Sequence, residues 1–423
     1  MKPAGPRPAW LWPAFSVGLV MAVLCACVLY EPLWLRLGVF HLKPYFADWF
    51  AVLAASDARA AGADPYAIPN YFDPLGRPHI YGPWWLELSR LGLTRDHNFV
   101  SGLGLAFAVI GFGSWMLAPR GPGAALAAAA VLAAPGFLLA YERGNNDLVI
   151  VLLLATAGLA IGRGDAPGRA FAMVALVFAA GLKIYPVAAV GLLLAARPAG
   201  WRRDGVRLGL AVGGFVLIAL VHGDEFQRAM ALVPRVDTAQ AYGLPVFSYL
   251  WRNPAMLHSW LLAGLLPGFG FWLWRAWRGW RLPVVAAGPT EQAWLLGGAG
   301  AWLLCYAVNT NFCYRIILLL LPAAAWLRAA QGSPSADRAQ ARWAVVGLIV
   351  TVWLALFHPG MQQISTLAQL RASAWALGLE NGLVLGLTLY LVWEAGRLVR
   401  ARWRDYGFGG GPTASSSSAA PTS

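Results

Sequence analysis

Asp48 is the acidic residue of this apolar chain that is best placed to do chemistry. It lies among apolar and aromatic residues in the sequence Phe46-Ala47-Asp48-Trp49-Phe50. A carboxylate that is partly withdrawn from water is suited to accept a proton as a general base. The alternative is that Asp48 caps an interfacial helix beginning at Trp49. The sequence leaves both readings open.

A second polar segment is the turn at 141–147, Tyr-Glu-Arg-Gly-Asn-Asn-Asp, between two runs of Ala, Leu and Val. Helix capping explains one asparagine and the aspartate at most. Polar residues at membrane depth usually serve a function. We therefore expect Asn145, Asn146 and Asp147 to contact a ligand.

Isolated cations form the third chemical feature. Arg143, Lys183 and Arg315 each stand alone between apolar stretches, on the same predicted side of the chain. Snorkelling from a helix end is the alternative, and it suits Arg315 well. Cations gathered on the face where topology disfavours positive charge point to a bound anion. A phosphate held by charge-assisted hydrogen bonds is the natural candidate.

Motifs for nucleotides and metals are missing from the sequence. It has no P-loop, no glycine-rich dinucleotide fingerprint, no Asp-x-Asp pair and no His-Glu-x-x-His, and its six histidines are scattered. The four cysteines lie in or beside apolar stretches and lack metal-ligand spacing. We therefore expect no cofactor and no metal site.

The elements that position these residues must lie in a membrane. The chain has 423 residues, of which 59% are hydrophobic and 12% are charged. Soluble domains are about 45–50% apolar and about 25% charged, and disordered chains are less apolar still. The composition therefore predicts an all-α polytopic membrane protein.

Twelve apolar stretches are candidate spans. Two of them, 170–183 and 184–196, are each only about 20 Å long, short of a hydrocarbon core of about 30 Å. We expect two short helices that meet at Lys183-Ile184-Tyr185-Pro186, because one long helix kinked at Pro186 would violate the positive-inside rule. The twelve stretches are 10–30, 99–118, 122–141, 147–162, 170–183, 184–196, 208–222, 254–274, 291–308, 315–328, 343–358 and 374–394.

Charge sets the predicted orientation. The net charge of +13 would suggest nucleic acid in a soluble protein, but here nearly all of the excess falls on one side of the predicted spans. That side is assigned to the cytoplasm together with both termini, and nucleic acid is excluded as a partner. We expect a single transmembrane domain over 1–406, an extracytoplasmic catalytic loop at 31–98, and a disordered cytoplasmic tail at 407–423.

In their order and spacing, the polar segments resemble glycosyltransferase family 87. These are bacterial membrane enzymes of the GT-C type that use polyprenyl-phosphate sugars. The resemblance runs from about residue 45 to 330, and its motifs are Asp48-Trp49-Phe50, Gly62-Ala63-Asp64-Pro65-Tyr66, Tyr81-Gly82-Pro83, Arg143-Gly144-Asn145-Asn146-Asp147, Gly181-Leu182-Lys183-Ile184-Tyr185-Pro186 and Asn311-Phe312-Cys313-Tyr314-Arg315.

The resemblance implies a GT-C-like fold in the bacterial inner membrane. Asp48 would be the base, with Asp64 as its alternative, and a mannose-like hexose or a pentose would pass with inversion to a glycolipid or cell-envelope glycan. Lys183, Arg315 and Arg143 would hold the lipid phosphate. The residues expected to contact sugar or acceptor are Asp64, Tyr66, Tyr81, Asn145, Asn146, Asp147, Tyr185 and Asn311.

Two other classes of function stay open. A transporter or flippase for lipid-linked sugars would use the same cations without needing Asp48. A non-enzymatic assembly protein would use the polar turns only to cap helices. Loss of sugar transfer with persistent lipid binding in an Asp48→Asn variant would separate the enzyme from the flippase. The assembly protein predicts that Lys183→Ala and Arg143→Ala leave all glycan products unchanged.

Overall fold

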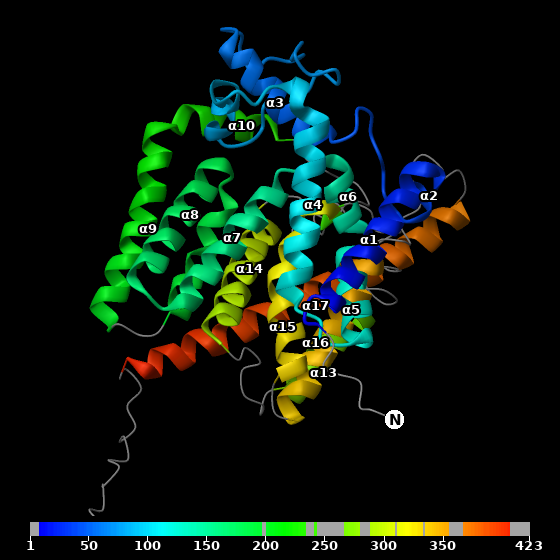
Figure 1. The fold of residues 1–423 in the computed structure, drawn as a ribbon, viewed down its shortest axis with the longest axis vertical. Coiled ribbons are helices and arrows are strands. Elements are labelled where there is room, and N and C mark those ends of the chain that lie inside the picture. The colour runs from blue at the N-terminus through cyan, green and yellow to red at the C-terminus, as the bar shows by residue number, and fades with distance from the viewer. Residues whose placement is uncertain are drawn as a thin grey trace, which may run out of the picture.

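The computed structural model describes residues 8–196, 200–233, 241–242, 266–279, 288–308, 311–332, 335–354 and 367–406. These residues form a helical bundle with one ladder of two-residue strands, so the predicted helical architecture is confirmed (Figure 1). The α-helices are α1 Leu11–Leu29, α2 Pro32–Arg36, α3 Ala47–Ala60, α4 Asn98–Leu117, α5 Pro122–Leu132, α6 Pro135–Arg143, α7 Asp147–Arg163, α8 Ala166–Leu182, α9 Trp201–Val221, α10 Gly223–Leu232, α13 Leu266–Gly279, α14 Pro289–Val308, α15 Leu320–Gly332, α16 Ser335–Trp353 and α17 Leu367–Asp405.

Four short 3₁₀ helices and two strands complete the described elements. The strands β1 (Ala241–Tyr242) and β2 (Asn311–Phe312) pair antiparallel. The 3₁₀ helices are η1 Pro83–Leu91, η2 Arg95–His97, η3 Tyr185–Ala195 and η5 Cys313–Leu319.

Five helices in the described residues are long and apolar enough to cross a membrane. A sixth span results if α5 and α6 are taken together. Every one of the twelve predicted stretches overlaps an observed helix, although 254–265 lies outside the described residues. The five spans are Leu11–Leu29, Arg95–Leu117, Trp201–Val221, Cys313–Gly332 and Gly378–Asp405.

Prolines explain where apolar stretches break. The predicted span 122–141 is two helices that meet at 55°. Pro135 opens the second one, and Ala134 before it is extended (φ −62°, ψ 147°), as a residue that precedes proline prefers to be. The expected break after α8 is present, since Lys183 is extended (φ −152°, ψ 148°) and Pro186 lies in the first turn of η3.

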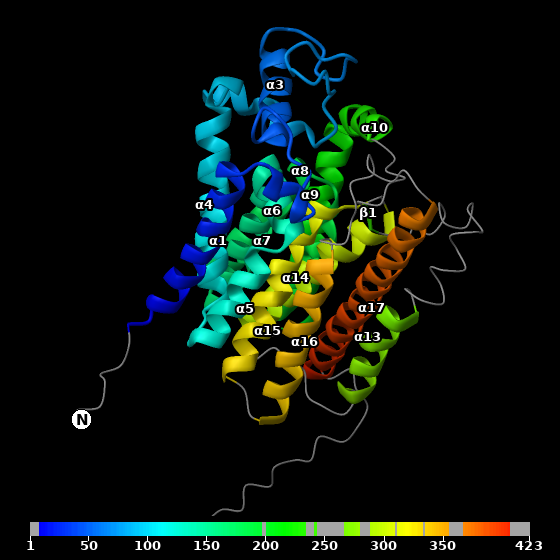
Figure 2. The same cartoon turned by 90° about the vertical axis from the view of Figure 1, so that its right-hand side faces the viewer.

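Helix α14 is central to the packing, because it contacts η3, α7, α15 and α17. The Trp294 side chain of α14 is fully buried and donates a hydrogen bond to the Ala155 carbonyl of α7 (2.9 Å). The C-terminal helix α17 runs beside α13 (Figure 2). These contacts make a continuous apolar core around the polar groups described below.

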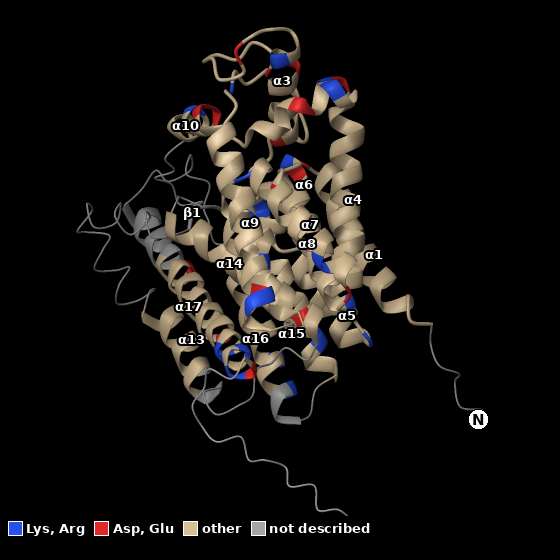
Figure 3. Ribbon diagram, turned by 90° about the vertical axis from the view of Figure 1, so that its left-hand side faces the viewer, with Lys and Arg blue, Asp and Glu red and all other residues tan. Residues whose placement is uncertain are grey.

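One end of the bundle carries α3 and α10 (Figure 1), with η1 packed against α3, and we call it the α3 end. An ion pair between Arg59 of α3 and Glu225 of α10 (2.6 Å) joins these two helices. Figure 3 shows charged residues at this end and at the opposite end, with a smaller number between them, for example beside α6. The loop predicted at 31–98 thus contains helices of its own and covers the α3 end.

Candidate functional site

Asp48 lies in the first turn of α3, which begins at Ala47 rather than at Trp49. The residue before the helix is Phe46, in a left-handed conformation (φ 57°), and no side chain caps this end of the helix. The reading of Asp48 as a helix cap is therefore wrong. Its buried carboxylate is bound by side chains from other segments instead.

Two segments supply the groups around Asp48. The Arg77 Nη1 group donates to Asp48 Oδ1 at 3.3 Å, and the Asn145 amide donates to Asp48 Oδ2 at 2.8 Å. The Arg143 Nη1 group lies 3.9 Å from Oδ1. Two guanidinium groups thus compensate the negative charge, and each carboxylate oxygen has two lone pairs, so Oδ2 can still accept a second hydrogen bond.

Arg77 was not predicted from the sequence. Asp73 orients it, because Arg77 Nε lies 2.7 Å from Asp73 Oδ2 and the Arg77 N–H donates to the same oxygen at 3.2 Å. The Arg77 Nη2 group also donates to the Ala47 carbonyl at 2.5 Å. The available signal was the Asp-Pro-Leu-Gly-Arg turn at 73–77, in which an Asp side chain often bonds the backbone that follows.

Arg143 does not lie where the sequence analysis grouped it. Its Nη2 group donates to the Phe40 carbonyl at 2.9 Å, and its Nε is 3.1 Å from Glu142 Oε2. It is therefore beside Asp48 and is absent from the described lining of the cavity that Lys183 and Arg315 share.

A second buried cluster surrounds Asp147. The Lys183 ammonium forms an ion pair with Asp147 Oδ1, and the Tyr185 hydroxyl donates to the same oxygen at 2.6 Å. Arg315 Nε lies 4.0 Å from Asp147 Oδ2. Asp147 is fully buried and Lys183 is 6% exposed. Removing either charge would therefore leave the other buried and uncompensated, which is strongly destabilising.

The α6–α7 turn connects the two clusters. Asn145, which binds Asp48, accepts a hydrogen bond from the Asp147 N–H at 2.9 Å. Gly144 is left-handed (φ 56°), and a Cβ there would meet Phe46 at 2.9 Å and Trp49 at 3.0 Å. The turn therefore packs tightly against the start of α3. Its Asn145 side chain contacts Asp48 on α3 and the backbone N–H of Asp147 on α7.

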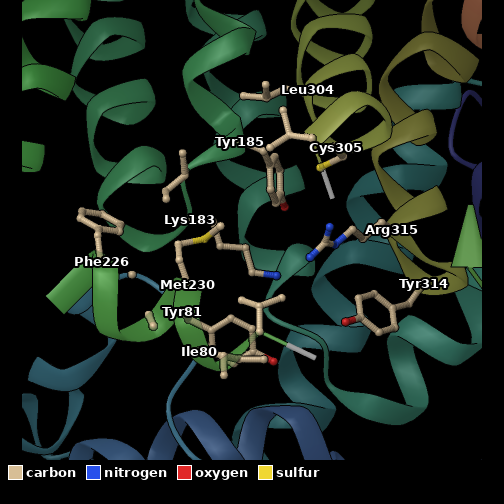
Figure 4. A pocket seen from close by; sticks show the side chains of 15 residues that line it. Ile80, Tyr81, Lys183, Tyr185, Phe226, Met230, Leu304, Cys305, Tyr314 and Arg315 are labelled. Atoms are coloured by element: carbon tan, nitrogen blue, oxygen red, sulfur yellow. The ribbon is translucent and has the colours of Figure 1, made fainter. Parts of the chain in front are cut away.

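Lys183 and Arg315 point into a cavity of about 160 Å³ at the α3 end (Figure 4). Tyr81, Tyr185 and Tyr314 line it as well, and the Lys183 ammonium is 5.0 Å from the centre of the Tyr81 ring. Apolar side chains of α10 and α14 close the remaining wall, and none of the described lining residues is acidic. A small anionic group next to an apolar chain suits this composition.

An apolar groove lies near the same end. It holds about 350 Å³ between α1 and α4, and its lining is apolar except for side chains such as Tyr45, Tyr141 and Glu142. Because α1 and α4 are both candidate spans, a hydrocarbon chain is the natural occupant of such a groove. Glu142 accepts a hydrogen bond from the Leu42 N–H at 2.8 Å, which fixes the loop that leads to Asp48.

The remaining predicted residues lie elsewhere. Asp64 is in a turn, where it accepts from the Tyr66 N–H (3.1 Å) and from Arg228 (2.6 Å), and its side chain is 48% exposed. Tyr66 is buried against Leu86, and burial raises the pKa of its hydroxyl to about 12. Neither residue is among those that line the cavity.

Asn146 and Asn311 were also predicted to contact sugar or acceptor. Asn146 is fully buried, and its side-chain amide has no hydrogen-bond partner among the described residues. The backbone of Asn311 pairs with Tyr242 in the short strand ladder, while its side chain lies outside what the structure describes. Tyr314, which the sequence analysis quoted but did not assign, lines the cavity beside Arg315.

Within the described ranges, no group of three His, Cys, Asp or Glu side chains is arranged to hold a metal ion. Comparisons of the chain with protein families, with curated proteins and with solved structures gave no match. The geometry of the Asp48 and Asp147 clusters is therefore the basis for a functional proposal.

Proposed function

We propose that the chain is an inverting glycosyltransferase that uses a polyprenyl-phosphate sugar. One observation carries the proposal: a single turn binds a carboxylate on one side and a pair of cavity-lining cations on the other. Asn145 holds Asp48, and Asp147 holds Lys183 and lies near Arg315. A base and an anion site at one end of a membrane bundle are what transfer from a lipid phosphate requires.

Asp48 acts as the general base in this proposal. Its carboxylate takes the proton of an acceptor hydroxyl while the acceptor oxygen attacks the anomeric carbon of the sugar. The bond between that carbon and the phosphate oxygen breaks on the opposite face, so the configuration inverts. The products are the glycosylated acceptor, polyprenyl phosphate and a protonated Asp48, which returns its proton to water.

Lys183 and Arg315 stabilise the leaving group. The phosphate oxygen gains negative charge as the sugar departs, and cations already fixed by Asp147 need little reorganisation to receive it. Tyr81, Tyr185 and Tyr314 shape the wall around this phosphate and the attached sugar. The groove between α1 and α4 would take the chain of a lipid substrate.

Arg77, Arg143 and Asn145 are positioning residues in this account. They fix the carboxylate so that one lone pair of Oδ2 is free for the acceptor hydroxyl. Asp64 is the weaker choice of base, because it is half exposed and bound to Arg228.

The proposed setting is the bacterial inner membrane, with a GT-C-like arrangement of about twelve spanning or half-spanning helices. The α3 end would be extracytoplasmic and both termini cytoplasmic, in keeping with the positive-inside rule. A mannose-like hexose or a pentose is the proposed sugar, and a glycolipid or cell-envelope glycan the acceptor.

An Asp48→Asn variant tests the proposal. The amide keeps the shape of the side chain but cannot take a proton, so turnover should fall by about 10²–10⁴-fold. Asp96→Asn is the matched control, because Asp96 is an exposed acid of the same loop whose side chain forms no hydrogen bond or ion pair among the described residues. Unchanged transfer in the Asp48 variant would overturn the assignment of Asp48 as the base. Movement of intact sugar lipid across the bilayer, without sugar transfer by the unmodified chain, would favour a flippase.

A further inference from the structure

A basic pocket lies at the end of the bundle opposite the α3 end. Helix α4 starts beside α3 and runs for 20 residues, which carries the chain about 30 Å away. Arg120 comes three residues after the end of α4 and lines the pocket with Arg338 and Arg342 of α16. Figure 3 shows Lys and Arg at this end of the bundle, and α5 contacts α16.

The pocket is built for an anion. It holds about 560 Å³, and besides three arginines its described lining includes Gln331 and no acidic side chain. The side chains of Arg120 and Arg342 are exposed and have no partner among the described residues. Gln331 accepts a hydrogen bond from the Arg120 N–H at 2.7 Å, which ties this corner to α15.

The start of α5 adds to the positive potential. Gly121 precedes the helix and no side chain caps its start. The first N–H groups of the helix, those of Gly123 and Ala124, therefore lack a side-chain cap, and both residues line the pocket. Gly121 and Gly123 both border the pocket, and a Cβ on either would meet nothing within 4 Å. A helix start of this kind favours a phosphate, here beside three guanidinium groups.

Apolar surface continues from the pocket into the region of the spans. Ala127, Leu327, Val345 and Val346 form its apolar wall. Val346 of α16 is itself 46% exposed, and Leu126 of α5, outside the pocket lining, is 55% exposed. A ligand with a phosphate at one end and a hydrocarbon chain at the other matches both parts.

We propose that this pocket binds the phosphate of an anionic membrane phospholipid, whose acyl chain lies along α5 and α16. The site is distinct from the proposed catalytic cavity, and the inference does not depend on sugar transfer. Each arginine near a membrane surface strengthens binding of an anionic headgroup by about fivefold. The three together distinguish an anionic lipid from a zwitterionic one.

Native mass spectrometry of the full chain in detergent, with added phosphatidylglycerol or phosphatidylcholine, tests the proposal. The variant Arg120→Gln/Arg338→Gln/Arg342→Gln removes the pocket charges. The control Arg203→Gln/Arg400→Gln/Arg404→Gln removes the same charge from exposed arginines outside the pocket, whose side chains form no hydrogen bond or ion pair among the described residues. We expect the pocket variant to weaken phosphatidylglycerol binding about a hundredfold and the control to leave it within about twofold.

Three results would overturn the proposal. Equal binding of the two lipids by the unmodified chain would remove the anionic preference. An equal loss in the control variant would reduce the effect to net charge. Complete displacement of the lipid by inorganic phosphate at roughly 10 mM would show that a free anion, rather than a lipid, is bound. Thermal unfolding in phosphatidylcholine checks folding, and each single Arg→Gln variant should weaken binding about fivefold if the triple variant is unstable.

Discussion

A methyl group at Gly82 should weaken the contact between the loop before η1 and the C-terminal end of α8, which Lys183 follows. The Gly82 N–H donates to the Leu182 carbonyl at 2.9 Å, and the Trp85 indole donates to the same oxygen at 3.0 Å. In Gly82→Ala the new Cβ would lie 2.6 Å from the Leu182 oxygen and closer still to that of Gly181. Both are backbone atoms, so they cannot rotate away.

The cost follows from these distances. Real Cβ atoms essentially never come within 3.0 Å of such an atom, so the Leu182 oxygen must retreat by at least about 0.4 Å and the Gly181 oxygen by more. Overpacking costs about 1–3 kcal/mol, and two weakened hydrogen bonds add about 1 kcal/mol each. Backbone strain adds nothing, because Gly82 already has φ −64°.

Thermal unfolding in detergent measures this effect. An entropy of unfolding of about 2.1 cal/mol/K per residue converts about 3–5 kcal/mol into a fall in Tm of about 3–6 °C for a chain of this length. Gly104→Ala is the control, because Gly104 is an exposed residue of α4 with nothing within 4 Å of an added Cβ. It should leave Tm unchanged or raise it by about 1 °C. Equal Tm values for the two variants would refute the reasoning.

Three further predictions concern the two clusters and the loop. Lys183→Gln leaves Asp147 buried without its ion pair, so we expect a loss of about 3–5 kcal/mol in unfolding free energy and a donor KM raised about 10–100-fold, neither of which an exposed Arg163→Gln change should reproduce. Asn145→Leu should lower kcat while donor binding, measured by calorimetry, stays within about threefold, because Asn145 positions Asp48 and does not line the cavity. Burial lowers the pKa of His79 to about 4, so the folded chain keeps this ring neutral while the unfolded chain protonates near its usual pKa of 6.5, and stability should fall by about 3 kcal/mol between pH 6.5 and 4. A His79→Gln variant should flatten that part of the pH dependence of Tm, and an unchanged pH profile would contradict the assignment.

Helix positions were the part of the fold that the sequence predicted best, because long apolar runs have few alternatives in a membrane. The expected break at Lys183 and Ile184 is present for the same reason. The bend at Pro135 was missed, since the apolar run continues through it. The start of α9 at Trp201 was missed too, because Arg202 and Arg203 end the apolar signal while the helix continues.

The site was only half predictable. Asp48, Lys183 and Arg315 stand out because charge is rare in apolar surroundings. Arg77 and Asn145 reach Asp48 from 29 and 97 residues away, so their role depends on the path of the loop and on how the α6–α7 turn packs on α3. Arg143 was grouped wrongly with Lys183 for this reason. Both cations are isolated in the sequence, but the guanidinium group of Arg143 donates to the Phe40 carbonyl and lies beside Asp48.

Release of polyprenyl phosphate is the measurement that tests the central claim most directly. The full chain, reconstituted in liposomes with a polyprenyl-phosphate sugar and an extracted envelope glycolipid, would be assayed for the free lipid phosphate by mass spectrometry. The account predicts that the lipid phosphate accumulates in step with glycosylated acceptor, and that Asp48→Asn abolishes both while donor binding persists. Intact sugar lipid moved to the other leaflet, or equal release by the Asp48 variant, would contradict it.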